Sequence, residues 1–363
     1  MLIHVWVPGR FDRVGGIQAF SRFFVEALTA TCDVRVLSLH DKGRDGCGDV
    51  STPWRNLSFA RMVFFAALRD RPDRIVLTHL HFAPVAKIIA LLLRIPFDVV
   101  AHGVEAWRID RKIVRWSLKS AERVLAVSKT TRERMYESGL VPMGRIQLLP
   151  NTADEDRFSL RPLDAVLLSR FGINAASRFL LTVCRLDASE QYKGYDGVIR
   201  ALPDVIQVFP DVHYILVGDG DDRPRVERLI ADLGLRSRVT CVGRVTDSDL
   251  PLFYNAASLF LMPGWGEGFG IVFLEALFSG VPCLGSVTDG SKDALCHGEL
   301  GVLVHPGDDA ELVEGIISSL RAPTDRVQLR CAALERFGLT AFRGRVKELF
   351  ASGETFPSVS GSV

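Results

Sequence analysis

The sequence lacks the cysteine patterns that mark a metal or disulfide framework. Its seven cysteines are scattered, odd in number and form no C-x-x-C pair. Neither a structural zinc site nor a set of disulfides is therefore indicated, and a reducing compartment fits this usage best.

Long hydrophobic runs are also missing. The most apolar stretch, residues 85–100, is interrupted by Lys87, Arg94, Pro96 and Asp98, and it falls short of the roughly 20 apolar residues that span a bilayer. The first residues read as an apolar strand, without the basic region and small-residue cleavage site of a signal peptide. We expect a cytoplasmic protein with no export signal.

Net charge is scarce but unevenly distributed. The formal charge is +1, yet residues 1–160 contain 24 Lys and Arg against 17 Asp and Glu, whereas residues 161–363 contain 20 against 26. Opposite signs on two halves suggest that the basic half faces an anionic membrane or acceptor, or that two oppositely charged domains attract each other.

The chain has 363 residues, 48% of them hydrophobic, which is enough for two α/β domains. Apolar β-rich runs alternate with helical segments, as in parallel sheets with helical crossovers. Strands are expected at 2–7, 33–39, 74–79, 97–101, 123–127 and 146–149, and then at 179–184, 212–217, 239–243, 258–262, 281–285 and 301–304. The sequence predicts two Rossmann-like domains whose parallel sheets face a central cleft.

A polar, turn-rich segment separates the two series of strands. We place the linker at Pro150–Phe158, between an N-terminal domain at 1–160 and a C-terminal domain at 161–336. Residues 337–351 are expected to form a helix that crosses back to the first domain, and 352–363 a disordered tail.

Motifs that directly follow strands have the most weight, because ligands of open parallel sheets bind beyond the carboxyl ends of the strands. Gly15 and Gly16 precede an apolar helix, so their amides and the helix N-terminus suit a phosphate, although such pairs are often only tight turns. His102 ends the fourth strand and suits a reacting group or sugar hydroxyls, although many such histidines only satisfy local backbone groups.

The second domain carries the stronger motifs. Arg185 and Lys193 follow its first strand, where two cations suit a diphosphate or are merely solvated surface charges. Gly268, Phe269 and Gly270 form a glycine-rich loop that opens into a helix. Glu275 lies in that helix, where its carboxylate can accept hydrogen bonds from both ribose hydroxyls of a nucleotide, and Glu267 lies just outside it, toward the sugar.

Three further features lie at strand ends of the second domain. Gly218 ends a strand at the cleft, and a nucleobase is expected against Val242 and Gly243. Asp219 and Asp221 imitate a D-x-D motif of the kind that holds a divalent metal, but they enter a helix whose amides they are expected to cap. No metal site is predicted.

Taken together, these motifs resemble the large sucrose-synthase-like group of retaining glycosyltransferases with the GT-B fold, glycosyl transferases group 1 or family four. The most specific mark is the E-x7-E pattern of Glu267 and Glu275, within G-E-G-F-G-I-V-F-L-E-A. The resemblance implies that Glu267 meets the donor sugar, Glu275 the ribose and the Gly-Phe-Gly amides the diphosphate. It also implies that Arg185 and Lys193 neutralise the diphosphate, that Gly15 and Gly16 form the acceptor-side loop and that His102 lies in the active site.

The resemblance further implies that the N-terminal domain binds the acceptor and the C-terminal domain the nucleotide sugar. It implies transfer of a hexose, such as mannose or glucose, from a UDP- or GDP-sugar to a glycan or lipid-linked acceptor of a cell-surface polysaccharide. It implies a front-face, retaining mechanism without a metal or other cofactor. Epimerases, phosphorylases and small-molecule glycosyltransferases of the same fold remain alternatives. A catalytically inactive nucleotide-sugar-binding protein and a dehydrogenase remain open as well, while no nucleic-acid partner is indicated.

A basic stretch lies outside these motifs. Arg108, Arg111, Lys112, Arg115 and Lys119 recur at helical spacing, beside Trp107 and Trp116. We expect one cationic helical stripe, which either rests on anionic lipid at the inner face of the plasma membrane or is a solvated face with its tryptophans packed inward.

Overall fold

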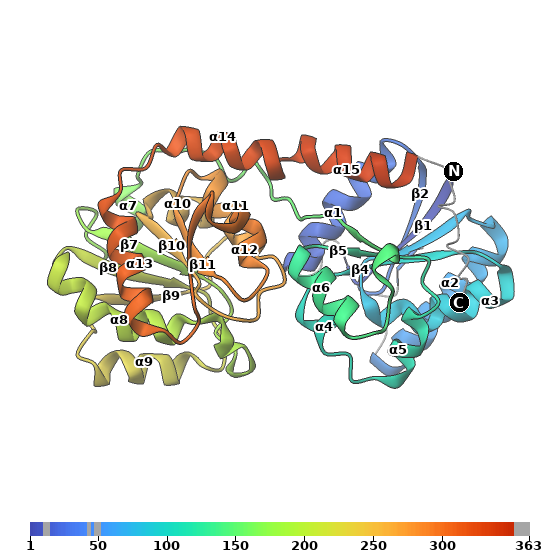
Figure 1. The fold of residues 1–363 in the computed structure, drawn as a ribbon, viewed down its shortest axis with the longest axis horizontal. Coiled ribbons are helices and arrows are strands. Elements are labelled where there is room, and N and C mark those ends of the chain that lie inside the picture. Colours follow the sequence, from blue (N-terminus) through green and yellow to red (C-terminus); the bar gives the residue numbers. More distant parts are fainter. Residues whose placement is uncertain (10–14, 42–44, 47–51, 352–363) are drawn as a thin grey trace, which may run out of the picture.

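The computed structural model describes residues 1–9, 15–41, 45–46 and 52–351, and it has two lobes (Figure 1). The first lobe is built on a parallel six-stranded sheet in the order β2-β1-β3-β4-β5-β6. Its strands are β1 Leu2–Val7, β2 Asp33–Ser38, β3 Arg74–Leu77, β4 Phe97–Ala101, β5 Arg123–Ala126 and β6 Ile146–Leu148. Its helices are α1 Gly16–Thr29, α2 Thr52–Asp70, α3 Ala83–Leu93, α4 Val104–Trp107, α5 Lys112–Leu118 and α6 Lys129–Glu137.

The second lobe repeats this plan with a parallel sheet in the order β12-β11-β10-β7-β8-β9. Its strands are β7 Arg178–Val183, β8 Val212–Val217, β9 Val239–Gly243, β10 Leu259–Leu261, β11 Cys283–Ser286 and β12 Gly301–Val304. Its helices are α7 Ala165–Arg170, α8 Tyr195–Val208, α9 Arg223–Asp232, α10 Leu250–Ala256, α11 Ile271–Phe278, α12 Ser291–Ala294, α13 Asp309–Arg321 and α14 Arg326–Phe337. The predicted architecture of two facing parallel sheets is confirmed.

Both faces of the first sheet are covered, which explains why its strands are almost continuously apolar. Alternate residues of β1 point to opposite sides: Ile3 and Val5 pack with α1, whereas Trp6 packs with Phe59 of α2 and Phe82. Every residue of β4 is buried. Even the charged Asp98 in that strand is buried, and it is held by Arg74 and Arg123.

The last two helices join the lobes. Helix α14 lies on the second lobe, and α15 (Leu339–Ala351) continues to the first, where it packs against α1 (Figure 1). Phe342 and Phe350 of α15 make edge contacts with Phe20 and Phe24 of α1, at ring-centroid distances of 5.9 Å. The limits at residues 160 and 336 stay predictions, and the tail predicted at 352–363 lies outside the described residues.

The expected cationic stripe is not one helix. Helix α4 ends at Trp107, Arg108–Arg111 are irregular and α5 begins at Lys112. Tertiary contacts override the helical spacing, because the Trp107 indole donates to Thr131 Oγ1 at 3.2 Å and stacks on Arg134, and Ile109 is buried. The five basic side chains nevertheless remain exposed.

Candidate active site

Loops from both lobes meet between the two sheets. Gly103, after β4, has a φ of +140°, and a Cβ there would lie 2.4 Å from the Cα of Gly268 in the second lobe. The lobes are also joined by Thr130 of α6, whose amide and hydroxyl donate to Asp293 of α12 at 3.0 and 2.9 Å. The strand-end motifs of the two domains therefore share one interface.

His102 is oriented by three contacts. Its Nε2 lies 2.9 Å from the carbonyl oxygen of Thr78, its amide donates to Glu105 Oε1 at 2.6 Å and its ring makes an edge contact with Phe20. A carbonyl only accepts, so Nε2 carries the proton and Nδ1 carries the lone pair in the neutral ring. Burial lowers the pKa of His102, which favours this neutral form at pH 7.

Lys193 is held by carboxylates at the mouth of β7. It lies in a 3₁₀ turn, Ala188–Lys193, with its Nζ 3.4 Å from Glu267 Oε2 and 3.9 Å from Glu190 Oε2. Burial acts to lower the pKa of this amine, but the neighbouring groups, Glu267 foremost among them, together outweigh burial and the pKa of Lys193 is raised. Lys193 is thus a permanently charged cation next to the glutamate that was predicted to meet the sugar.

Glu190 is a member of this cluster that sequence reasoning missed. It pairs with Arg185 through Oε1, and its other carboxylate oxygen accepts no hydrogen bond from the described residues. Glu190 therefore bridges the two cations predicted to bind a diphosphate. Its position three residues before Lys193 was the available signal, since that spacing brings side chains together in a helical turn.

The glycine-rich loop after β10 is positioned by its backbone. Gly268 faces the first lobe so closely that a Cβ there would lie 1.7 Å from the carbonyl oxygen of His102. Gly270 has a φ of +85° and precedes α11. The described residues offer no hydrogen-bond acceptor to the amides of Gly268, Phe269 and Gly270, so these donors can bind an anion at the helix N-terminus.

Asp289 supports this loop and was also missed. Its Oδ2 accepts from the amide of Glu267 at 2.8 Å, and burial raises the pKa of Asp289 to about 6. The aspartate follows β11, whereas its partner follows β10, so only the tertiary pairing of these strands brings them together.

Glu275 lies one and a half turns into α11, where Tyr254 orients it. The Tyr254 hydroxyl donates to Glu275 Oε2 at 2.7 Å, and burial raises the pKa of Glu275 to about 7. This carboxylate has one oxygen fixed and remains able to accept further hydrogen bonds. Tyr254 lies in α10, and no local motif pointed to it.

Two glycines predicted in the first domain lie opposite the donor loop. Gly15 is the N-cap of α1, and a Cβ on Gly16 would lie 3.5 Å from Cδ1 of Ile271, the first residue of α11. The structure thus brings Gly15 and Gly16 to the N-terminus of α11. Residues 10–14 of the same loop lie outside the described residues.

Gly218 has a steric role. Its φ is +136°, and a Cβ would lie 1.7 Å from the carbonyl oxygen of Cys184. Gly218 also donates to the carbonyl of Gly243 at 2.9 Å, so β8 and β9 are joined where they end. The nearby Asp247 pairs with Arg157 of the linker. Base recognition at Val242 and Gly243 stays a prediction.

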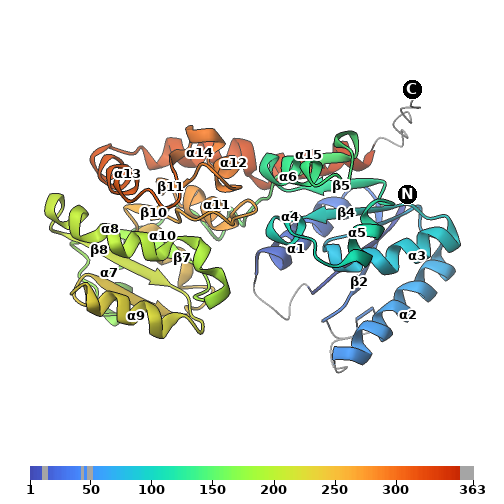
Figure 2. The same ribbon diagram turned by 60° about the horizontal axis from the view of Figure 1, so that its bottom comes forward.

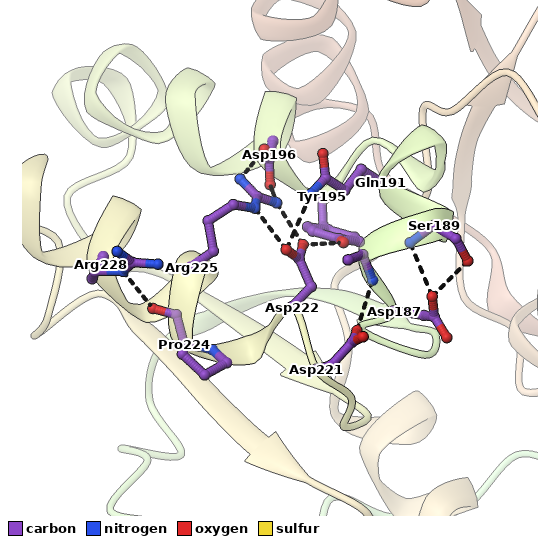
Figure 3. Close-up of polar contacts among 11 residues, drawn as sticks. Asp187, Ser189, Gln191, Tyr195, Asp196, Asp221, Asp222, Pro224, Arg225 and Arg228 are labelled. Carbon is purple, nitrogen blue, oxygen red and sulfur yellow. Dashed lines mark hydrogen bonds and ion pairs between the residues drawn. The ribbon is translucent and has the colours of Figure 1, made fainter.

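The aspartates after β8 do not cap α9, which corrects our expectation (Figure 3). Asp222 occupies the N-cap in a helical backbone conformation, φ −83° and ψ −13°, whereas a capping side chain needs an extended one. It instead accepts from Gln191, Tyr195 and Arg225 at 3.1, 2.6 and 2.6 Å. Asp221 accepts from the amide of Ala188 at 2.8 Å (Figure 3), and Asp219 pairs with Arg223. The carboxylates of Asp221 and Asp222 therefore support the Arg185–Lys193 segment.

His79 is engaged with the turn that it begins. The Nδ1 of His79 accepts from the amide of His81 at 3.2 Å, and burial lowers the pKa of His79 to about 3. The His79 ring therefore stabilises the turn that leads to His81.

Solved structures share the whole architecture. HepE of Anabaena, solved in complex with UDP-glucose, superposes with a TM-score of 0.79 at 22% identity over 97% of this chain and 100% of that one. WaaG, a glycosyltransferase involved in lipopolysaccharide biosynthesis, gives a TM-score of 0.67 at 19% identity over 97% and 100%. The protein therefore has the GT-B fold of nucleotide-sugar-dependent glycosyltransferases.

Sequence comparison identifies the family. Residues 14–157 match the model of Glycosyltransferase Family 4, and residues 169–336 match that of Glycosyl transferases group 1. The chain belongs to this glycosyltransferase family and is of the hexosyltransferase type, as the resemblance of the E-x7-E pattern implied.

Curated relatives point to the same class. A GDP-mannose-dependent alpha-(1-6)-phosphatidylinositol monomannoside mannosyltransferase of Mycolicibacterium smegmatis is 28% identical over 92% of this chain and 93% of the relative. A phosphatidyl-myo-inositol mannosyltransferase of Mycobacterium leprae is 28% identical over 92% and 91%. An N-acetyl-alpha-D-glucosaminyl L-malate synthase of Bacillus anthracis is 25% identical over 74% and 71%.

None of the helices in the described ranges is long and apolar enough to cross a bilayer.

Proposed function

We propose that the protein is a retaining, metal-independent glycosyltransferase that transfers a hexose, mannose or glucose, from a UDP- or GDP-sugar to a lipid-linked acceptor in cell-surface polysaccharide synthesis. It works in the cytoplasm at the inner face of the plasma membrane. The observation that supports the donor part is the set of groups that the loops of the second lobe present: the Glu275 carboxylate, the Gly268–Gly270 amides without an acceptor among the described residues, and two cations, Arg185 and Lys193, with Glu267 beside Lys193. We assign Glu275 to a ribose, the amides and the two cations to a diphosphate, and Glu267 to the sugar.

The site is better suited to stabilising a leaving group than to abstracting a proton. Arg185, Lys193 and the Gly268–Gly270 amides gather positive charge where the diphosphate departs, and such preorganised donors usually supply a large share of catalysis. Glu267 and Glu190 keep Lys193 charged and fixed. A donor phosphate oxygen then takes the proton of the acceptor hydroxyl as it enters on the same face, which retains the anomeric configuration.

His102 completes the sugar pocket from the first lobe. In its neutral form, with Nε2–H donated to Thr78, the Nδ1 lone pair is available to a sugar hydroxyl. Gly103 and Gly268 let the two backbones approach closely enough to bring His102 beside the donor loop.

The lipid-linked acceptor is supported by the relatives. The mycobacterial relatives are named for transfer to phosphatidylinositol derivatives, whereas the Bacillus relative makes a malate glycoside. A small-molecule acceptor is therefore the second candidate, and product analysis separates the two.

A transfer assay tests the proposal. Thermal-shift measurements with UDP, GDP and ADP first identify the base, since a ligand at 100 times its dissociation constant stabilises a protein by about 2.7 kcal/mol. The corresponding nucleotide sugar is then supplied with membrane lipid extract, with and without EDTA. We expect hexose in the lipid fraction at an EDTA-independent rate. An EDTA-sensitive rate would refute the metal-independent mechanism.

A further inference from the structure

Exposed apolar side chains gather on three helices of the first lobe. Nine of the twenty large hydrophobic side chains exposed in the described residues belong to α2, α3 and α5. Monomeric soluble proteins seldom expose contiguous apolar patches unless a partner covers them. The cluster therefore needs an explanation that the donor site does not supply.

Helix α2 has an outward apolar stripe. Trp54, Leu57, Phe65 and Leu68 are 66%, 52%, 59% and 42% exposed, and their spacing places them on one face, together with Arg61. The opposite face, which includes Phe59, is buried against the sheet. Core packing thus accounts for one side of α2 only.

Helices α3 and α5 extend the stripe. Leu91 and Leu92 of α3 are 66% and 64% exposed, and Ile113 and Trp116 of α5 are each 46% exposed. Lys87 of α3 joins these two helices: its Nζ lies 3.3 Å from the centroid of the Trp116 ring and donates to the Trp116 carbonyl. Helix α3 contacts both α2 and α5, and the three lie together on the outer side of the lobe (Figure 2). We call this surface the α2–α3–α5 face.

Its charges are almost all positive. The segments 52–70, 83–93 and 108–119 contain nine Lys and Arg against two Asp and Glu. One of the two acids, Asp70, is already paired with Arg35 and Arg69. Arg108, Arg111, Lys112, Arg115 and Lys119 are exposed beside Ile113 and Trp116. Apolar side chains bordered by exposed cations complement an anionic lipid surface, where headgroups meet acyl chains.

We propose that the α2–α3–α5 face docks on an anionic bilayer, with its apolar side chains in the acyl boundary and its cations at the headgroups. This inference rests on the proposed lipid-linked acceptor. Residues 103–119 connect His102 directly to this face, so docking holds the acceptor-binding lobe at the bilayer surface.

Vesicle flotation tests the proposal. The probes are phosphatidylcholine vesicles with graded phosphatidylglycerol, at low and high salt. The apolar variant carries Phe65→Ser and Leu92→Ser, and the charge variant carries Arg111→Gln, Lys112→Gln and Arg115→Gln. The matched control carries Val166→Ser and Val327→Ser, two side chains of the second lobe that are 73% and 60% exposed. All substituted side chains are exposed, so folding should be preserved.

We expect the parent and the control to float with anionic vesicles. The charge variant should lose about 100-fold in partitioning at low salt, since each cation contributes about fivefold. The apolar variant should lose at least about tenfold at both salt concentrations. Brominated lipid should quench fluorescence from the exposed Trp54 and Trp116 in the parent.

Three results would overturn the proposal: flotation independent of lipid charge, an apolar variant that floats like the parent, or a parent that sediments as a dimer through this face and ignores vesicles. Turnover is also measured on a detergent-solubilised acceptor, where no bilayer is needed. This measurement distinguishes a failure of the docking proposal from a failure of the proposed function. The docking variants should retain that turnover, because none of their substitutions touches the cleft.

Discussion

At the scale of single residues, Glu275 carries the prediction for nucleotide binding. Glu275→Ala should remove the two hydrogen bonds that we propose to the ribose hydroxyls, each worth about 1.5 to 3 kcal/mol when the carboxylate is ionised. Calorimetric titration with the matching nucleoside diphosphate should show affinity reduced at least about 100-fold. Tyr254→Phe is the control, since it removes only the hydroxyl that orients the carboxylate, and it should have a smaller effect. Unchanged affinity in Glu275→Ala would exclude the ribose contact.

The same carboxylate makes stability depend on pH. Burial raises the pKa of Glu275 to about 7, so the folded state holds a proton that the unfolded state has released. Protonated Glu275 contributes fully to the free energy of unfolding below the unfolded pKa of about 4.5. This contribution is lost as pH rises through about 7. Between about pH 5 and pH 8, denaturant unfolding should show a smaller loss of unfolding free energy in Glu275→Gln than in the parent. Part of the loss should remain in the variant, because burial also raises the pKa of Asp289 to about 6. Equal losses in both proteins would contradict the assignment.

Arg185 carries the catalytic prediction more cleanly than Lys193. The Arg185 side chain is 72% exposed, whereas Lys193 neutralises the partly buried Glu267 and Glu190. Arg185→Gln should therefore lower turnover at saturating donor by about 100-fold with little effect on folding. Arg178→Gln, at the other end of β7, is the matched control and should remain within a few-fold of the parent. If the turnover of Arg185→Gln also remains within a few-fold of the parent value, Arg185 does not stabilise the departing diphosphate.

At the scale of elements, the α9 N-terminus supports the donor segment through Asp222. Three side chains donate to this buried carboxylate, and hydrogen bonds, above all from Arg225, lower the pKa of Asp222 to about 2. Asp222→Asn should cost about 2 kcal/mol or more in the free energy of unfolding near neutral pH. Asp221→Asn, which loses only charge on a bond to one amide, should cost less.

The pH dependence gives this prediction a second readout. Ionised Asp222 contributes fully to the free energy of unfolding above the unfolded pKa of about 3.8. This contribution is lost as pH falls through about 2. The stability difference between parent and Asp222→Asn should therefore shrink on acidification. A constant difference down to about pH 2 would show that the ion pair is not its source.

Sequence patterns predicted these elements wherever the signal was local. All twelve expected strands are present with shifts of at most two residues at their ends, because buried parallel strands are continuous apolar runs. The E-x7-E loop was equally visible, since glycines and a helix start occupy adjacent positions. The missed residues Tyr254, Asp289 and Asp222 act across elements, and spacing along the chain cannot show tertiary pairing. The Arg108–Arg111 break has the same origin, in contacts of Trp107 with α6.

At the scale of the molecule, we expect catalysis to require contact between the lobes. The interface is formed by the Gly103–Gly268 approach and by Thr130 with Asp293. Gly268→Ala would place a methyl group 1.7 Å from the His102 carbonyl oxygen, and we expect the lobes to separate to relieve this clash. Small-angle scattering should show a larger radius of gyration, and turnover should fall.

Gly144→Ala is the control for this prediction, because a Cβ at Gly144 meets nothing within 4 Å. The closed arrangement would not be required for activity if Gly268→Ala opened the lobes and left turnover at the parent value. Lobes that stay closed would show that the backbone absorbs the methyl group locally.

The central claim is that a nucleotide sugar bound between the lobes donates its hexose with retention. Proton NMR of the product formed from an α-linked UDP- or GDP-hexose and membrane lipid extract tests this claim most directly. The account predicts an α-linked glycolipid, formed by the parent and strongly reduced in Arg185→Gln. A β-linked product, or no transfer from any UDP- or GDP-hexose, would contradict it.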